Sequence, residues 1–188
     1  MTQESQGHRY GFLAGVTILI ILLDQASKSY IMNTMYLHQS IPIIPDLFSL
    51  TYIRNPGAAF GILADSSGAF RTVFFVITSV FALGLLGTIF IRLEPDDWWG
   101  QLTIVSIFAG AIGNLIDRLQ FGEVIDFLDF YVNGYHWPAF NVADSAISVG
   151  VVSLLILFAL DKKKTETPAQ PKPSEPSPTE PSPQEPHP

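Results

Sequence analysis

Two aspartates in the last third of the chain, Asp126 and Asp144, are the residues best placed to support chemistry. They belong to a polar connection between two apolar segments, Leu102–Ile116 and Val142–Leu160. When two carboxyl groups share a site their pKa values separate, so that one stays protonated while the other acts as a base. Such a pair can activate water against a peptide bond and protonate the departing amine without a metal. We therefore predict that these two carboxylates meet at one site.

Polar and ionisable residues also lie at the ends of other apolar segments. They are Asp24, Lys28, Asn55, Asn114, Asp117, Arg118 and Asn141. Ionisable groups near hydrocarbon are energetically unfavourable, so a chain that places several of them there usually uses them in its function. Four separate polar clusters, from four segments, would converge at one face of a membrane. That convergence favours a functional site.

The polar clusters also have purely structural explanations. Asn141, followed three residues later by Asp144, resembles a capping box at the start of a helix. Asp24 and Lys28 are four residues apart, as in an ion pair at a helix end with the lysine reaching toward the membrane interface.

The third helix and the connection after it leave similar alternatives. Asn114 and Arg118 could cap the carbonyl end of a helix, where a cation is favoured. Asp126 and Asp129 are three residues apart, and spacing alone does not decide which of them would meet Asp144.

The composition indicates a membrane protein. Of the 188 residues, 48% are hydrophobic and 14% are charged, whereas about a quarter of the residues in a soluble domain are charged. Four segments are long enough to span a bilayer: Gly11 to about Met32, Phe70–Ile91, about Gly100–Arg118, and about Asn141–Leu160. The run Gly11–Leu23 would also suit a signal peptide, but no small-x-small cleavage pattern follows it.

Short extended segments separate these helices. Ser40–Ile44 and Phe48–Ile53 are rich in β-branched and aromatic residues, which predicts a small hairpin-like sheet outside the hydrocarbon. Pro56-Gly57 suits the two central positions of a type II turn. Asn133-Gly134 predicts a tight two-residue hairpin turn.

We therefore expect an all-α membrane protein with a small β element, in which four transmembrane helices carry a small extended or hairpin-like sheet outside the hydrocarbon. The lysines at 162–164 place both termini in the cytoplasm by the positive-inside rule. Asp126 and Asp144 would then lie at the extracytoplasmic face. Residues 1–164 form the predicted membrane domain, and the Pro-, Ser- and Glu-rich residues 165–188 are predicted to form a disordered cytoplasmic tail.

Composition also excludes several functions. The net charge of −7 argues against nucleic-acid binding. The chain has no cysteine, and its four histidines lack zinc-site spacing, so neither a metal nor a cofactor is expected. An ion-coupled transporter could use Asp24, Asp126 and Asp144, but the sequence has no evident internal repeat with broken helices. A membrane scaffold without chemistry is the third alternative.

Five motifs in order resemble lipoprotein signal peptidase, or signal peptidase II, a family of bacterial aspartic membrane proteases. The motifs are DQASK at Asp24–Lys28, RNPGAAFG at Arg54–Gly61, GAIGNLIDR at Gly110–Arg118, VIDF at Val124–Phe127 and FNVADS at Phe140–Ser145. The resemblance covers about Gly11–Leu160 and leaves out the tail. It implies a bundle of four transmembrane helices with a small extracytoplasmic β-cradle.

The resemblance implies a protease of the inner membrane that removes the signal peptide from diacylglyceryl-modified prolipoproteins, just before the lipidated cysteine. It assigns Asp126 and Asp144 as the catalytic pair. The matching positions that would bind substrate or support the site are Asp24, Lys28, Asn55, Gly57, Asn114, Arg118 and Asn141. The expected partners are lipid-modified prolipoproteins and membrane lipids, with the enzyme as a monomer.

Overall fold

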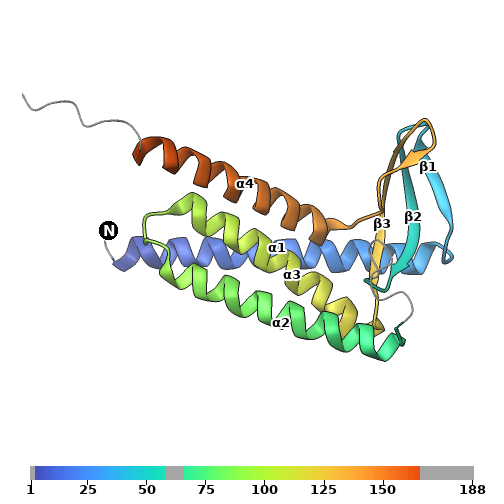
Figure 1. The fold of residues 1–188 in the computed structure, drawn as a ribbon, viewed down its shortest axis with the longest axis horizontal. Helices are drawn as coiled ribbons and strands as arrows, with labels where there is room; N and C mark the ends of the chain where they lie inside the picture. Colours follow the sequence, from blue (N-terminus) through green and yellow to red (C-terminus); the bar gives the residue numbers. More distant parts are fainter. Residues whose placement is uncertain (1–2, 58–65, 166–188) are drawn as a thin grey trace, which may run out of the picture.

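The computed structural model describes residues 3–57 and 66–165. Its elements follow the order α1 (Gln3–Thr34), β1 (Ser40–Ile44), β2 (Phe48–Asn55), α2 (Gly68–Arg92), α3 (Trp98–Phe121), β3 (Val124–Val132), β4 (Tyr135–His136) and α4 (Val142–Thr165). The helices run along the long axis of the molecule, and the sheet stands at one end of them (Figure 1). The start of α1 and the end of α4 both lie at the other end.

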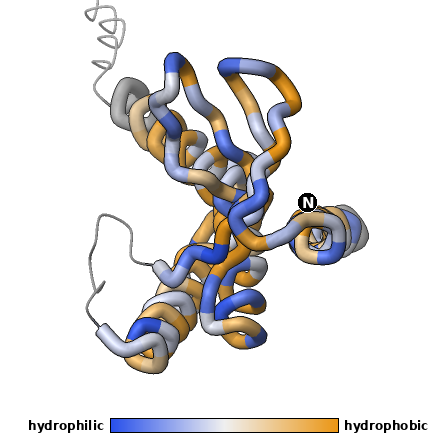
Figure 2. The backbone as a smooth tube through the Cα atoms, turned by 90° about the vertical axis from the view of Figure 1, so that its right-hand side faces the viewer, coloured by the Kyte–Doolittle hydropathy of each residue, from blue (hydrophilic) through white to orange (hydrophobic). Residues whose placement is uncertain are grey.

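All four helices are long and apolar enough to cross a membrane. Hydrophobic residues predominate along them in the view from the sheet end (Figure 2). The apolar side chains of α2 face outward, because none of the residues of this helix is buried against the rest of the protein. Its Phe81 side chain is 75% exposed. Large apolar surfaces of this kind suit contact with lipid. The predicted class, four spanning helices with a small β element, is confirmed.

All four helices extend beyond their predicted bounds, and two of them do so by five residues or more. The first begins at Gln3 instead of Gly11, and the fourth continues through Asp161 to Thr165. The polar residues at both ends lack proline, and the lysines at 162–164 are good helix formers, so the helical backbone continues past the apolar segment. Apolarity sets the length of a membrane span, but it does not end a helix.

The four strands form one antiparallel sheet in the order β1-β2-β3-β4. The first two strands match the predicted extended segments. The turn at Asn133-Gly134 is also confirmed, because both residues have positive φ, 51° and 78°, as a type I′ turn requires. The strand β3 differs from the polar connection expected for this segment, because Val124–Val132 pairs with β2.

A hydrophobic cluster fixes the sheet to the helices. Ile31 in the last turn of α1 and Met35, just after the helix, pack with Tyr52 of β2 and with Ile125 and Phe127 of β3. Side chains alternate along a strand, so the residue between Ile125 and Phe127 must point to the other face of the sheet. That residue is Asp126.

Close packing around α3 depends on two glycines. A Cβ atom at Gly110 would collide with the carbonyl oxygen of Ala143 in α4, and one at Gly113 would lie 2.6 Å from Asp24 Oδ2. These small residues therefore allow the helices to approach closely. It brings α1, α3 and α4 together directly beneath the sheet.

Candidate active site

Asp126 lies at the sheet end of the bundle, where β2 holds it from one side. It pairs with Ile53 in the antiparallel register, which leaves Asn55 close beside it. Asn55 Nδ2 donates a hydrogen bond of 2.9 Å to Asp126 Oδ2. From the other side, Asn141 Nδ2 donates a bond of 2.8 Å to Asp126 Oδ1. Both carboxylate oxygens therefore receive neutral amide donors.

The environment of Asp126 disfavours its charged form. The residue is 2% exposed, and burial is the main cause that raises its pKa, to about 7. The amide of Asn55 opposes this shift, and the nearby negative charge of Asp144 adds to it. The amide of Asn141 and the positive charge of Lys28 lower the pKa by smaller amounts. Near neutral pH, Asp126 is therefore able both to hold and to release a proton.

Asp144 lies in the first turn of α4, opposite Asn114. Asn114 Nδ2 donates a hydrogen bond of 2.7 Å to Asp144 Oδ1. The backbone N–H of Asn141 donates to Asp144 Oδ2 at 3.3 Å, and the backbone N–H of Asp144 donates to Asn141 Oδ1 at 2.9 Å. This reciprocal pair is the capping box that the sequence suggested. The structural explanation of this motif is thus correct, and it holds Asp144 next to Asn114.

Asn141 links the two carboxylates. It is fully buried, and its side-chain amide contacts Asp126 Oδ1, the carbonyl oxygen of Ile125 and Asn114 Oδ1. Its backbone N–H meanwhile reaches Asp144. Within the described residues no hydrogen bond joins the two acids directly, so the amide of Asn141 lies between them. The cap of α4 and the site are built from the same side chain.

A second polar cluster, which we call the Lys28 cluster, consists of Lys28, Asp24, Asp117 and Gln25. Lys28 Nζ lies 2.8 Å from Asp24 Oδ2 and 2.9 Å from Asp117 Oδ2. It also donates to Asn114 Oδ1 at 3.1 Å. All three ammonium protons thus have an acceptor. The predicted pairing of Asp24 with Lys28 is confirmed, but Lys28 is only 1% exposed. The alternative in which this lysine reaches to the interface is wrong.

The carboxylates of this cluster also hold backbone amides. Asp24 Oδ1 accepts a bond of 2.9 Å from the N–H of Ala143, in the first turn of α4. Asp117 Oδ2 accepts one of 3.1 Å from the N–H of Ile125, next to Asp126. Amides at the start of a helix lack intrahelical acceptors, so Asp24 satisfies one that would otherwise be unpaired. The cluster therefore positions both segments that carry the candidate acids.

Two members of the cluster were not identified as site residues from the sequence. Gln25 Nε2 donates to Asp24 Oδ2, Asp117 Oδ1 and the carbonyl oxygen of Gly113. Asp117 lies three residues after Asn114, so the helical period already placed them on one face of α3. That spacing was the available signal for Asp117. For Gln25 the signal was weaker, a single amide beside Asp24.

Arg118 and Gly57 support the site indirectly, because within the described residues neither of them donates a hydrogen bond to Asp126 or Asp144. Arg118 Nη1 donates to the carbonyl oxygen of Asn114 at 3.1 Å, and its guanidinium lies 5.4 Å from the Phe75 ring centroid. Gly57 has φ of 82°, and a Cβ there would collide with Phe75. Its N–H donates to Asn55 Oδ1 at 2.8 Å. This bond directs the other end of the Asn55 amide toward Asp126.

Asp129 lies elsewhere, because it follows Asp126 by three residues on a strand and not on a helix. An odd spacing on a strand places two side chains on opposite faces. Asp129 Oδ1 lies 2.9 Å from His136 Nδ1. The structure thus brings Asp126, and not Asp129, to the capped start of α4.

A cleft of about 680 Å³ opens beside the acids. Asn55 and Asp144 form its polar side. Trp137, Phe140 and Val149 contribute large apolar side chains to it. In the part of the chain that the structure describes, no three metal-ligating side chains come together.

Comparison with known proteins gives a consistent result. Residues 16–160 match the family model for signal peptidase (SPase) II. The lipoprotein signal peptidase of Geobacter sulfurreducens is 53% identical over 147 residues, which are 78% of this chain and 91% of that protein. The lipoprotein signal peptidase of Syntrophus aciditrophicus is 49% identical over 138 residues, covering 73% and 86% of the two chains.

Solved structures agree with this result. One bacterial membrane enzyme superimposes with a TM-score of 0.74 at 36% identity, over 85% of this chain and 95% of its own. A second has a TM-score of 0.73 at 37% identity, over 80% and 94%. The match to the family model runs from within α1 through the sheet and into α4. This chain therefore belongs to the signal peptidase II family of bacterial membrane proteases.

Proposed function

We propose that this protein is an aspartic endopeptidase that removes the signal peptide from diacylglyceryl-modified prolipoproteins, cutting just before the lipidated cysteine. The observation that carries the proposal is the meeting of Asp126 and Asp144 on either side of Asn141, at the edge of a mainly apolar cleft. Membership of the signal peptidase II family supports the same substrate class.

The two acids have different local surroundings, which suggests different roles. Asp126, with its pKa raised to about 7, is the better proton carrier near neutral pH. Asp144 lies in the first turn of α4, where the helix dipole stabilises a negative charge. We assign Asp126 as the resting acid and Asp144 as the resting base, the division of labour typical of an aspartic dyad.

The reaction follows from these protonation states. The Asp144 carboxylate takes a proton from water while the water oxygen forms a bond to the scissile carbonyl carbon. Asp126 gives its proton to the carbonyl oxygen, which produces a neutral gem-diol. Asp144 then passes its proton to the amide nitrogen, the C–N bond breaks, and Asp126 recovers a proton from the diol. The products are a carboxylic acid and an amine, and both aspartates return to their starting states.

The surrounding residues have supporting roles in this scheme. Asn114 uses its side-chain amide and oxygen on Asp144, Lys28 and Asn141, so it orients the site. Asn55 lines the cleft as well as contacting Asp126, which makes it the amide best placed to meet a substrate backbone. The apolar cleft suits a signal peptide, which is itself a hydrophobic segment.

The proposed orientation places the sheet and the acids outside the cytoplasm and both termini inside it. Its basis is the lysine run at 162–164. A reporter fused after residue 164 should therefore behave as cytoplasmic, and one inserted at Asn133-Gly134 as extracytoplasmic. Each helix is continuous in the described chain, so the broken helices typical of many ion-coupled transporters are not seen there.

The direct experiment uses purified protein and a synthetic prolipoprotein peptide. One peptide carries a diacylglyceryl cysteine, and a matched peptide carries the unmodified cysteine. Mass spectrometry should find cleavage just before the lipidated cysteine, and little or none in the unmodified peptide. Folded protein that cuts neither peptide, or that still cuts after both aspartates are replaced by asparagine, would overturn the proposal.

A further inference from the structure

Two buried polar side chains at the other end of the bundle, Arg9 and Gln101, have atoms without a hydrogen-bond partner. Arg9 is 8% exposed, and neither its Nε nor its Nη2 makes a hydrogen bond in the described structure. Gln101 is 2% exposed, and its Oε1 likewise makes none there. Unpaired buried polar atoms are unfavourable and rare in native proteins, so a negatively charged partner that reached the Arg9 guanidinium would stabilise this end of the bundle.

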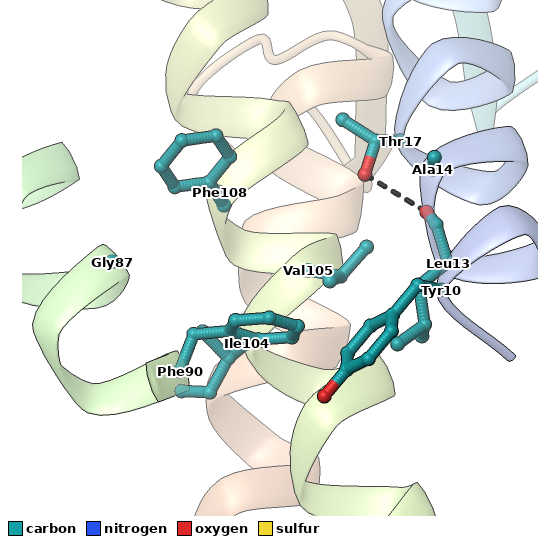
Figure 3. A pocket seen from close by; sticks show the side chains of 9 residues that line it. All are labelled: Tyr10, Leu13, Ala14, Thr17, Gly87, Phe90, Ile104, Val105 and Phe108. Carbon is teal, nitrogen blue, oxygen red and sulfur yellow. Dashed lines mark hydrogen bonds between the residues drawn. The ribbon is translucent and has the colours of Figure 1, made fainter. Parts of the chain in front are cut away.

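An apolar cavity of about 290 Å³ lies between α1, α2 and α3 (Figure 3). Its walls include Leu13 of α1, Phe90 of α2 and Ile104 and Phe108 of α3. The hydroxyl of Thr17 also borders it, but this group donates to the carbonyl oxygen of Leu13 at 3.0 Å. The cavity therefore offers its occupant an apolar surface.

The unpaired atoms lie one helical turn beyond this cavity. Arg9 precedes Leu13 by four residues, and Gln101 precedes Ile104 by three, so each shares a helix face with a cavity residue. Both positions are nearer the end of the bundle than the cavity, because α1 begins there and α3 enters from there. A polar end thus adjoins an apolar interior.

Aromatic contacts hold the Arg9 guanidinium at this polar end of the bundle. The Arg9 Cζ atom lies 5.6 Å from the ring centroid of Trp98, at the start of α3. The Trp98 ring also packs against Phe12, with centroids 5.1 Å apart. Tryptophan is enriched at the depth of lipid headgroups. The ion pairs found among the described residues do not include Arg9.

We propose that this end of the bundle binds an anionic phospholipid, with the headgroup phosphate at Arg9 and one acyl chain in the cavity. A guanidinium matches a phosphate in charge and in geometry. Free phosphate would satisfy Arg9 but leave the cavity unfilled, so the occupant is a lipid.

Lipid binding to delipidated protein in detergent tests the headgroup contact. Native mass spectrometry would compare phosphatidylglycerol, phosphatidylcholine and inorganic phosphate. Phosphatidylglycerol should bind most tightly, and Arg9→Gln should weaken it by about tenfold, the loss expected for a charge-assisted bond. Arg9→Lys should recover part of the affinity. The matched control is Arg92→Gln at the same end of the bundle, whose side chain is exposed and which should bind like the parent protein.

A second pair of variants tests the acyl chain. A Cβ atom at Gly87 or at Gly84 would meet nothing within 4 Å, but only Gly87 lines the cavity. Gly87→Leu should fill the cavity and weaken phosphatidylglycerol binding by about tenfold, the effect of losing roughly two buried methylenes. Gly84→Leu should leave it unchanged.

Several outcomes would overturn the proposal. They are equal binding of the two lipids, binding of inorganic phosphate as tight as that of the lipid, or equal effects of a variant and its control. Thermal unfolding in phosphatidylcholine shows whether each variant folds. If Arg9→Gln fails to fold, the comparison of Gly87→Leu with Gly84→Leu still decides the question. None of these measurements depends on the proposed protease activity.

Discussion

Two pairs of carboxylates lie side by side at the sheet end of the bundle, and they differ in their partners. Asp24 and Asp117 share the ammonium of Lys28, at 2.8 and 2.9 Å. Asp126 and Asp144 instead receive N–H groups of asparagines. The first pair has a counterion within contact distance, and the second pair has hydrogen bonds to neutral groups.

This difference separates a structural role from a chemical one. Carboxylates in direct contact with a shared cation can hold the helices that carry them in place. Two nearby carboxylates with only neutral donors repel each other, so one of them retains a proton into the neutral range. We infer that the Lys28 cluster positions the site and that the Asp126–Asp144 pair carries the reaction.

The largest effect on turnover should come from Asp126 and Asp144, the pair that has no counterion in contact. Asp126→Asn and Asp144→Asn keep size and most hydrogen bonding but cannot exchange the proton. Each should lower kcat by about 10²-fold or more, the lower range for loss of a general acid or base. The double variant should be little worse than either single one, because residues that act as a unit are not additive.

Initial rates on the lipidated peptide, with binding measured separately, check this prediction. Substrate affinity should change little in all three variants, since the loss belongs to the chemical step. Strictly multiplicative losses in the double variant would mean that the two acids act independently and not as a dyad.

The largest effect on stability should come from Asp24 and Asp117, the pair that shares the Lys28 ammonium, when this cation is removed. Lys28→Met removes the shared cation and leaves two buried carboxylates facing each other, which destabilises by about 3–5 kcal/mol. The unfolding midpoint in detergent should fall sharply. Asp144→Asn, by contrast, removes a carboxylate that has no counterion in contact, and it should leave the midpoint nearly unchanged or raise it. Equal midpoints for the two variants would erase the distinction between the pairs.

The stability of the protein and its turnover should both depend on pH through Asp126. The pKa of Asp126 is raised to about 7 in the folded protein, above the value of about 3.9 for an unfolded chain. The folded state therefore binds more protons between these values, and this residue's contribution to stability decreases as pH rises from about 4 to 7. Turnover should decline above about pH 7 as Asp126 loses its proton.

Unfolding and initial rates measured across this range test both statements. Between pH 4 and pH 7, the slope of the unfolding free energy against pH should be less negative in Asp126→Asn than in the parent protein. An unchanged slope would show that another group is responsible for it.

The smallest effect should come from Asp129→Asn. This aspartate lies on the opposite face of β3 and pairs with a half-exposed histidine, His136. An ion pair of that kind contributes about 0–1 kcal/mol. Turnover should stay within a few-fold of the parent value, in the same peptide assay. An inactive Asp129→Asn protein with an active Asp126→Asn protein would show that the acids had been assigned the wrong way round.

The sequence by itself determined which segments span the membrane and where several turns form. Apolar runs of spanning length located four helices, and β-branched residues located β1 and β2. The pair Asn133-Gly134 located a tight turn, because few other residues tolerate two positive φ angles in succession. These features depend on residues that are neighbours along the chain, so a local pattern is enough to reveal them.

Only the tertiary structure decided which polar groups from different elements become partners. Helical spacing placed Asp24 with Lys28, and Asn141 with Asp144, but it could not show that Lys28 is buried against Asp117. Nor could it show that β3 is a strand, because Ile125 and Phe127 are held there by packing against α1 and by pairing with β2. That strand then separates Asp126 from Asp129. Spacing fixes the faces of one element, whereas the meeting of faces from different elements depends on how those elements pack.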